Sequence, residues 1–141
     1  MTDKFEQISI KPGYMKHNGG ILFRKISDTE FEFKTTIDKN KLNSAGITHG
    51  GYICSIIDAG SGTSAHRASN NTPCVTVSLD VKFIGATRTG DEIKGFTKIQ
   101  KITKSMVFLI CYLESNSKIV ASASGVWKKL KKNTSGFGPG G

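Results

Sequence analysis

The chain has 141 residues, which is enough for one ordinary domain with a single core. Hydrophobic residues make up 37% and aromatic residues 9%, so the composition is globular and excludes a largely disordered chain. The formal net charge of +9 at pH 7 favours an anionic partner, such as nucleic acid, an acidic membrane or a ligand with several phosphates. Charge alone does not choose among them, and a solvated basic face is equally compatible with it.

The sequence shows no sign of export, membrane insertion or metal binding. Residues 1–11 contain no apolar run, and the longest one, Met106–Leu113, is too short to span a membrane. Cys54, Cys74 and Cys111 are far apart and form no CxxC pair. We therefore expect a soluble, cytoplasmic protein with buried free thiols and no metal site.

The first elements in chain order are two strands. Residues 1–18 contain Pro12 and Gly13 and give no clear pattern, so their structure is left open. Residues 21–26 predict a strand. Residues 31–37 alternate apolar and polar side chains, which predicts a half-buried strand paired with the first.

A long helix is predicted next. From Thr48 to Ala68 there is no proline, and apolar or small residues recur at helical spacing. Thr48 is a good N-cap, and Asn70 and Asn71 fit a C-terminal stop. Gly60 and Gly62 lower the helix propensity, which indicates that a surrounding sheet comes close to the helix there.

Four more strands are expected after the helix, at residues 75–83, 92–102, 106–113 and 119–127. The first alternates strictly, and the third is expected to be central and buried on both faces. The fold class is therefore α+β, with one helix packed on an antiparallel sheet of about six strands.

The domain is assigned to residues 19–132. An N-terminal segment of uncertain structure, residues 1–18, precedes it. Residues 133–141, which end in Gly-Pro-Gly-Gly, are expected to be a disordered tail.

The helix start is the first candidate site. If Thr48 caps the helix, His49, Gly50 and Gly51 form a first turn whose N–H groups have no intrahelical acceptor. Those donors and the positive end of the helix dipole are what an oxyanion site for acyl transfer requires. Taken alone, however, the glycine pair is explained better by a tight turn.

Asp58 is the second candidate. It is a poor helix former placed among apolar or small neighbours, where a carboxylate would gain the basicity of a general base. The alternative is a solvated carboxylate on the outer face of the helix.

The spacing of His49 and Asp58 bears on oligomeric state. They are nine positions apart, which on a helix is about 13 Å of rise and half a turn of phase. A site using both must form between two chains, which predicts an obligate dimer with two equivalent sites. Thr76 adds a hydroxyl that could orient a water, although strand propensity also explains a threonine there.

Together these residues form the string Asn43-x2-Gly46-x2-His49-Gly50-Gly51-x6-Asp58, then Thr76, then Phe83-x6-Gly90-Asp91. The string resembles the PaaI-like branch of the hotdog-fold acyl-CoA thioesterases, a branch that includes the phenylacetate-pathway enzymes and thioesterase superfamily member 2. The likeness runs from about Ile21 to Trp127. It implies a long helix wrapped by an antiparallel sheet, dimers with a continuous sheet, and commonly homotetramers.

The resemblance also implies roles. Asp58 would activate water or attack the thioester, while the Gly50 amide would polarise its carbonyl. His49 would support the helix entry, Asn43 would orient reactant or water, and Thr76 would lie beside the carboxylate.

Coenzyme A would be part of the substrate, with no separate cofactor. Ala86 stands where relatives often have proline. The coenzyme A contacts implied are Gly51, Phe83, Arg88, Lys101 and Lys104.

Three alternatives remain. A hotdog hydratase or dehydratase needs a histidine near the carboxylate, and His66 is the one histidine that follows Asp58. A non-catalytic acyl-CoA-binding protein would keep the pocket without the chemistry. A nucleic-acid binder is disfavoured, because no stacking aromatics are interleaved with the lysines.

Overall fold

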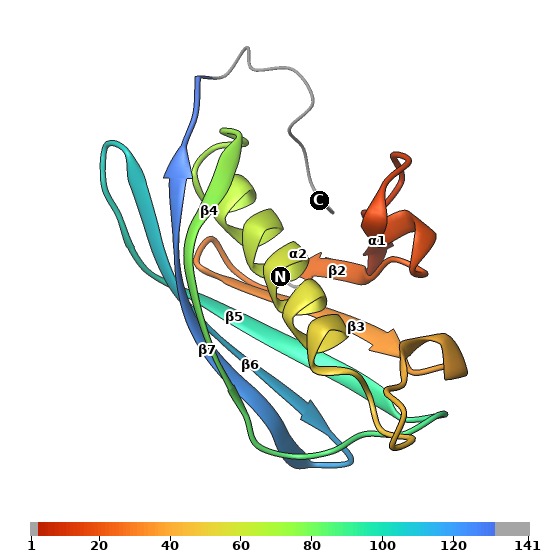
Figure 1. Ribbon diagram of the computed structural model, residues 1–141. Helices are drawn as coiled ribbons and strands as arrows, with labels where there is room; N and C mark the ends of the chain where they lie inside the picture. The colour runs from red at the N-terminus through yellow and green to blue at the C-terminus, as the bar shows by residue number, and fades with distance from the viewer. Residues whose placement is uncertain (1–2, 132–141) are drawn as a thin grey trace.

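The computed structural model describes residues 3–131, and it has one long helix held in a curved antiparallel sheet (Figure 1). The sheet has seven strands in the order β1-β2-β3-β5-β6-β7-β4. The elements are β1 (Glu6–Gln7), α1 (Tyr14–His17), β2 (Leu22–Lys25), β3 (Glu30–Thr36), a 3-10 turn (Lys39–Lys41), α2 (Gly50–Ala68), β4 (Cys74–Phe83), β5 (Glu92–Ile102), β6 (Met106–Ser115) and β7 (Lys118–Lys129).

The predicted α+β class is confirmed, with one correction to the strand count. The expected six strands become seven because Glu6–Gln7 pairs with β2 and extends the sheet by one short strand. Residues 1–18, left open above, also contain the short helix α1. The expected tail at 133–141 lies outside the described residues.

Close contact between α2 and the sheet explains two of the glycines. A Cβ atom on Gly60 in the helix, or on Gly95 in β5, would overlap the ring of Phe33 from β3. Phe33 is fully buried, so its ring fills a slot that the two glycines leave open. Beside it, the buried hydroxyls of Ser64 and Thr97 are hydrogen-bonded at 2.6 Å and join α2 to β5.

The helix begins one residue later than predicted. His49 is the N-cap, and its Nδ1 accepts the Gly51 N–H at 2.7 Å. Thr48 is buried and bonds instead to Thr87, 39 residues along the chain. The end was predicted correctly: α2 stops at Ala68, and Asn70 and Asn71 follow with positive φ.

The strict alternation expected in β4 is broken by a β-bulge. Thr76 is paired with Trp127 and Ser78 with Val126, so Val77 is the extra residue and is exposed. A one-residue insertion moves the side chains before it to the opposite face. Thr76 therefore lies on the inner face with the buried Trp127, whereas the strict alternation of residues 75–83 would place it on the polar face.

Strand β6 is central, but it is not buried on both faces as predicted. Val107, Leu109 and Leu113 face the core, whereas Ile110 and Tyr112 on the other face are about 40% exposed. One face of the sheet packs on α2 and the other is open in the single chain, which is the usual pattern of an antiparallel sheet.

The three cysteines are free thiols, as expected. Cys111 is buried in the core, and burial raises the pKa of its thiol to about 12. Cys54 and Cys74 are half-buried, so the expectation of full burial holds for Cys111 alone. None of the helices in residues 3–131 combines the length and hydropathy that a membrane span needs.

The Phe33 slot gives the first prediction. Gly60→Ala should lower the free energy of unfolding by about 1–3 kcal/mol, because the new methyl group meets the buried Phe33 ring. Gly62→Ala is the matched control on the same helix, since its Cβ would lie 3.4 Å from Trp127 Nε1 in ordinary contact. It should raise stability by up to about 1 kcal/mol through helix propensity. Urea titrations measure the free energy of unfolding of both variants. Equal changes in the two variants would contradict a close fit of the Phe33 ring against Gly60.

Candidate active site

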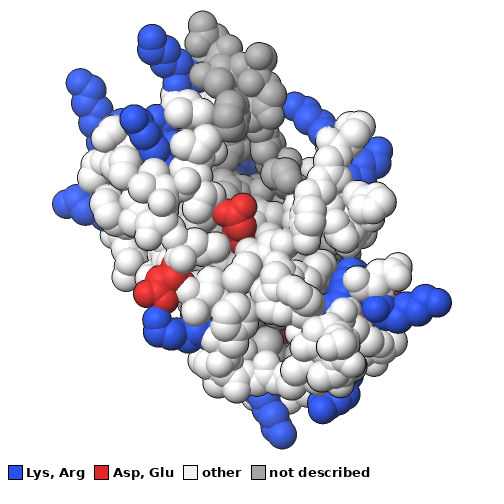
Figure 2. All heavy atoms as spheres, in the orientation of Figure 1, with Lys and Arg blue, Asp and Glu red and all other residues white. Residues whose placement is uncertain are grey.

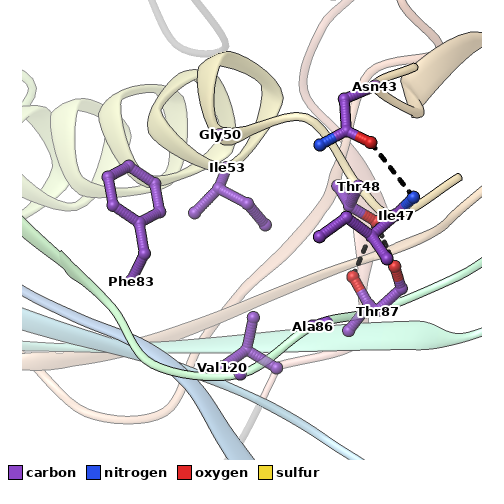
Figure 3. A pocket seen from close by; sticks show the side chains of 10 residues that line it. Asn43, Ile47, Thr48, Gly50, Ile53, Phe83, Ala86, Thr87 and Val120 are labelled. Atoms are coloured by element: carbon purple, nitrogen blue, oxygen red, sulfur yellow. Dashed lines mark hydrogen bonds between the residues drawn. The ribbon is translucent and has the colours of Figure 1, made fainter. Parts of the chain in front are cut away.

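A tight loop before α2 forms the first part of the site. The Asn43 side-chain oxygen accepts the backbone N–H groups of Ala45 (2.9 Å) and Ile47 (3.2 Å). This local cap explains an asparagine at the position. It also leaves the amide nitrogen of Asn43 turned towards the start of α2 (Figure 3).

A buried threonine pair fixes the loop to the connection between β4 and β5. The hydroxyls of Thr48 and Thr87 are 2.6 Å apart, and the Thr48 N–H donates to the Thr87 carbonyl at 2.9 Å. Both residues are buried. Sequence reasoning missed Thr87, because nothing in the local pattern shows a contact over 39 positions.

At the helix start, one amide is left open. The Gly51 N–H is bound by His49, and the N–H groups of Tyr52 and Ile53 donate to the His49 carbonyl. Within residues 3–131 the Gly50 N–H has no acceptor. His49 thus caps the helix through its side chain and occupies the Gly51 N–H. Of the two glycine N–H groups at the predicted oxyanion site, the one that stays open is that of Gly50.

A pocket of about 240 Å³ adjoins Gly50 (Figure 3). In Figure 3 the side chain of Ile53 extends from α2 towards Val120, with the Phe83 ring to one side. The pocket brings together three residues that the sequence had singled out, namely Asn43, Gly50 and Phe83. The full lining is Asn43, Ile47, Thr48, Gly50, Ile53, Phe83, Gly85, Ala86, Thr87 and Val120.

The second part of the site is a carboxylate–hydroxyl pair. Thr76 donates from Oγ1 to Asp58 Oδ1 at 2.6 Å, so Asp58 faces strand β4 and not the side of α2 remote from the sheet. The β4 bulge is what brings the Thr76 hydroxyl to this face. In the single chain the Asp58 side chain is exposed, so this chain alone does not supply the apolar surroundings that were expected.

The two parts are separated within one chain. Gly50 and Asp58 lie eight residues apart on α2, which is about 12 Å of rise. The structure therefore brings Asn43, Gly50 and Phe83 together at one place, and Asp58 and Thr76 at another.

The predicted cationic contacts also lie at two ends of the molecule. Arg88 follows β4 near the pocket, and its backbone N–H donates to Asp91. Lys101 and Lys104 lie at the β5–β6 turn, which bonds through Ser105 to the end of β7 beside the start of β4. Figure 2 shows lysine and arginine side chains spread around the margin of the face with α2.

His66 is held away from the carboxylate. Its Nδ1 bonds to the Thr72 carbonyl at 3.0 Å, and burial lowers the pKa of its imidazole. It lies eight residues, or about 12 Å, beyond Asp58 on α2. Across residues 3–131 there is no cluster of three or more His, Cys, Asp or Glu that could hold a metal ion.

A helix wrapped by an antiparallel sheet, with an open amide at the helix start and a carboxylate in its middle, defines a hotdog domain of the thioesterase type. The family model "Thioesterase superfamily" matches residues 45–116. A Pseudomonas aeruginosa protein named "Putative esterase PA0474" is 33% identical over 110 residues, covering 77% of this chain and 82% of that protein. The chain belongs to the thioesterase superfamily.

Solved structures agree on the fold. Zebrafish thioesterase superfamily member 2 superimposes with a TM-score of 0.79 at 17% identity, covering 86% of this chain and 90% of that one. A Streptococcus pneumoniae thioesterase solved with coenzyme A gives 0.75 at 16% identity, with 94% and 100% covered. Escherichia coli PaaI gives 0.66 at 18% identity, with 73% and 74% covered. The resemblance to PaaI-like proteins is thereby confirmed.

The threonine pair gives the second prediction. Thr48→Val keeps the shape but leaves the buried Thr87 hydroxyl without its partner, so the free energy of unfolding should fall by about 1–3 kcal/mol. Adding Thr87→Val removes the orphaned hydroxyl. The double variant should therefore be more stable than Thr48→Val alone in urea titrations, and a further loss on adding the second change would argue against the pairing.

Proposed function

We propose that the protein hydrolyses an acyl-coenzyme A to the free acid and coenzyme A, at a site shared between two copies of the chain. The observation that carries the proposal is the division of the site. The open Gly50 amide and its apolar pocket lie at one end of β4, and the Asp58–Thr76 pair lies at the other.

The position of β4 supports a dimer. Within residues 3–131 it is an edge strand, bonded to β7 on one side only, and it carries the exposed side chains of Val77 and Phe83. Such an edge is a template for pairing with another strand. A two-fold axis between Leu79 and Asp80 would pair β4 with itself and set Thr76 opposite the partner's Phe83.

That pairing would complete two equivalent sites. Asp58 and Thr76 of one chain would meet Gly50, Asn43 and the apolar pocket of the other. The β5–β6 turn, with Lys101 and Lys104, would also approach the partner's Arg88. These three cations would then face the anionic phosphates of coenzyme A, with Gly51 beside the same helix start. Further assembly of two dimers into a tetramer is part of the proposal.

The reaction would proceed as follows. The Gly50 N–H and the Asn43 amide hydrogen-bond the thioester oxygen and stabilise the negative charge that develops on it. Asp58, held by Thr76, accepts a proton as a water oxygen bonds to the carbonyl carbon. The C–S bond then breaks, and the proton passes to the leaving sulfur. In the other route Asp58 itself bonds to the carbonyl carbon, the C–S bond breaks to release the coenzyme A thiolate, and water hydrolyses the resulting anhydride.

The relatives give independent support. The Streptococcus pneumoniae thioesterase was solved with coenzyme A, and also as variants with one aspartate or one threonine changed to alanine. Those are the residue types paired here as Asp58 and Thr76. A hydratase is disfavoured by the bond between His66 and Thr72, and a non-catalytic acyl-CoA binder is the outcome that the next test separates.

Replacement of the carboxylate is the third prediction. Asp58→Asn should lower kcat by at least about a hundredfold, because the amide cannot take a proton from water. It should leave the fold and the affinity for coenzyme A unchanged. Released thiol from a panel of acyl-CoA thioesters measures the rate, and Asp28→Asn, in the exposed turn before β3, is the control.

Two outcomes would contradict this assignment. Unchanged turnover in Asp58→Asn would give the carboxylate a structural role. Coenzyme A binding by wild type, without turnover on any thioester, would favour the non-catalytic protein.

Mixed dimers give the fourth prediction. Gly50→Pro removes the N–H at the first helical position, where proline is tolerated, and Gly50→Ala keeps that N–H with the same added Cβ. The proline variant should lose about 10²–10³ in kcat relative to the alanine variant. Co-expressed with Asp58→Asn, it should regain about a quarter of wild-type activity, because half of the dimers would carry one intact site. No recovery, with mixed dimers verified by two affinity tags, would place the whole site in one chain.

A further inference from the structure

Most of the residues that line the pocket beside Gly50 are apolar or glycine, and the polar ones are Asn43, Thr48 and Thr87. Ile53 and Val120 are each 4% exposed and converge from α2 and β7 (Figure 3). The hydroxyls of Thr48 and Thr87 are bonded to each other, so this contact already engages both of them. The open donor, the Gly50 N–H, borders this pocket. The apolar side formed by Ile53 and Val120 suits a hydrocarbon group better than it suits the amides and phosphates of coenzyme A.

The size of the pocket limits what it holds. An apolar cavity of about 150 Å³ accommodates benzene. At about 240 Å³, this pocket has room for one ring with a short linker, or for an unbranched chain of similar bulk. It is below the range of about 300–1,000 Å³ usual for larger ligands.

Phe83 lines the pocket with a ring that is less enclosed than the side chain of Val120. Its backbone is fixed, because the following N–H groups of Ile84 and Gly85 both donate to the Val120 carbonyl, at 2.9 and 3.0 Å. In the single chain Phe83 is 59% exposed, and the ring edge lies 3.3 Å from where a Cβ on Gly50 would be. The ring thus stands directly beside Gly50, in the lining of the pocket.

We infer that this pocket holds the acyl group, that the substrates are short- to medium-chain or single-ring acyl thioesters, and that Phe83 sets the length accepted. The inference rests on the proposed function. It gives Phe83 a role in acyl selection, in place of the coenzyme A contact that the resemblance implied. A thioester oxygen on the Gly50 N–H directs the acyl chain past Ile53 and Val120, and the ring of Phe83 blocks its extension.

The test is the chain-length profile of kcat/KM for straight-chain acyl-CoA thioesters of four to sixteen carbons. Wild type should peak near eight carbons. Phe83→Ala should raise the ratio of the sixteen-carbon to the eight-carbon value by at least about tenfold, and Phe83→Trp should shift the peak to shorter chains. Ile84→Ala is the matched control, because Ile84 is the neighbouring residue, is 58% exposed and does not line the pocket. Its profile should follow wild type.

A binding experiment separates this inference from the proposed function. The probes are 2-oxoalkyl-coenzyme A thioethers, which keep the carbonyl but cannot be hydrolysed, titrated by calorimetry. In wild type the affinity should rise with chain length and level off near eight carbons, and in Phe83→Ala it should continue to rise. A profile unchanged in Phe83→Ala and Phe83→Trp, with hydrolysis still lost in Asp58→Asn, overturns the inference and leaves the thioesterase standing. No binding of any coenzyme A compound overturns both.

Discussion

The fit of Phe33 between Gly60 and Gly95 is the contact on which the geometry of this molecule depends. It allows α2 to lie directly on the sheet, and it fixes the rotation of the helix about its axis because the slot exists on one face only. The hydroxyl bond between Ser64 and Thr97 fixes the same face one turn later. Because that face of α2 packs on β3 and β5, Asp58 lies on a different face of the helix. The sheet curves around the helix, so that β4 lies beside Asp58.

The periodic features of the chain were predictable, and the features that break a period were not. Alternating and helical spacing located α2 and all the long strands, because burial of one face governs which residues repeat. The bulge at Val77 could not be read from residues 75–83, whose alternation is unbroken. Only the pairing of Thr76 with Trp127 in a neighbouring strand reveals it. The Thr76 hydroxyl nevertheless reaches Asp58 because of that bulge.

The residue that caps α2 was also not predictable from the sequence, for a different reason. Thr48 and His49 can each accept a hydrogen bond from the first turn, and local propensity favours threonine. The buried Thr87 decides the matter, because a hydroxyl 39 residues away takes Thr48 as its partner and leaves the cap to His49. The candidate residues themselves were identified from sequence. The family resemblance named the Gly50 amide, but the local pattern alone does not show which amide stays open, since that depends on the competition between these partners.

Pairing of β4 with a partner strand would account both for its position at the sheet edge and for the division of the site. In the described part of a single chain, one edge of β4 has no neighbouring strand, and the carboxylate that the proposed chemistry needs is exposed. A hydrated carboxylate is a weak base towards water, because solvent already satisfies its charge. A partner strand laid along β4 would cover the edge and exclude water from Asp58. It would also deliver an open amide to the same place. The same pairing step would therefore create both the interface and the base, so a monomer would lack the chemistry as well as the pocket opposite Asp58.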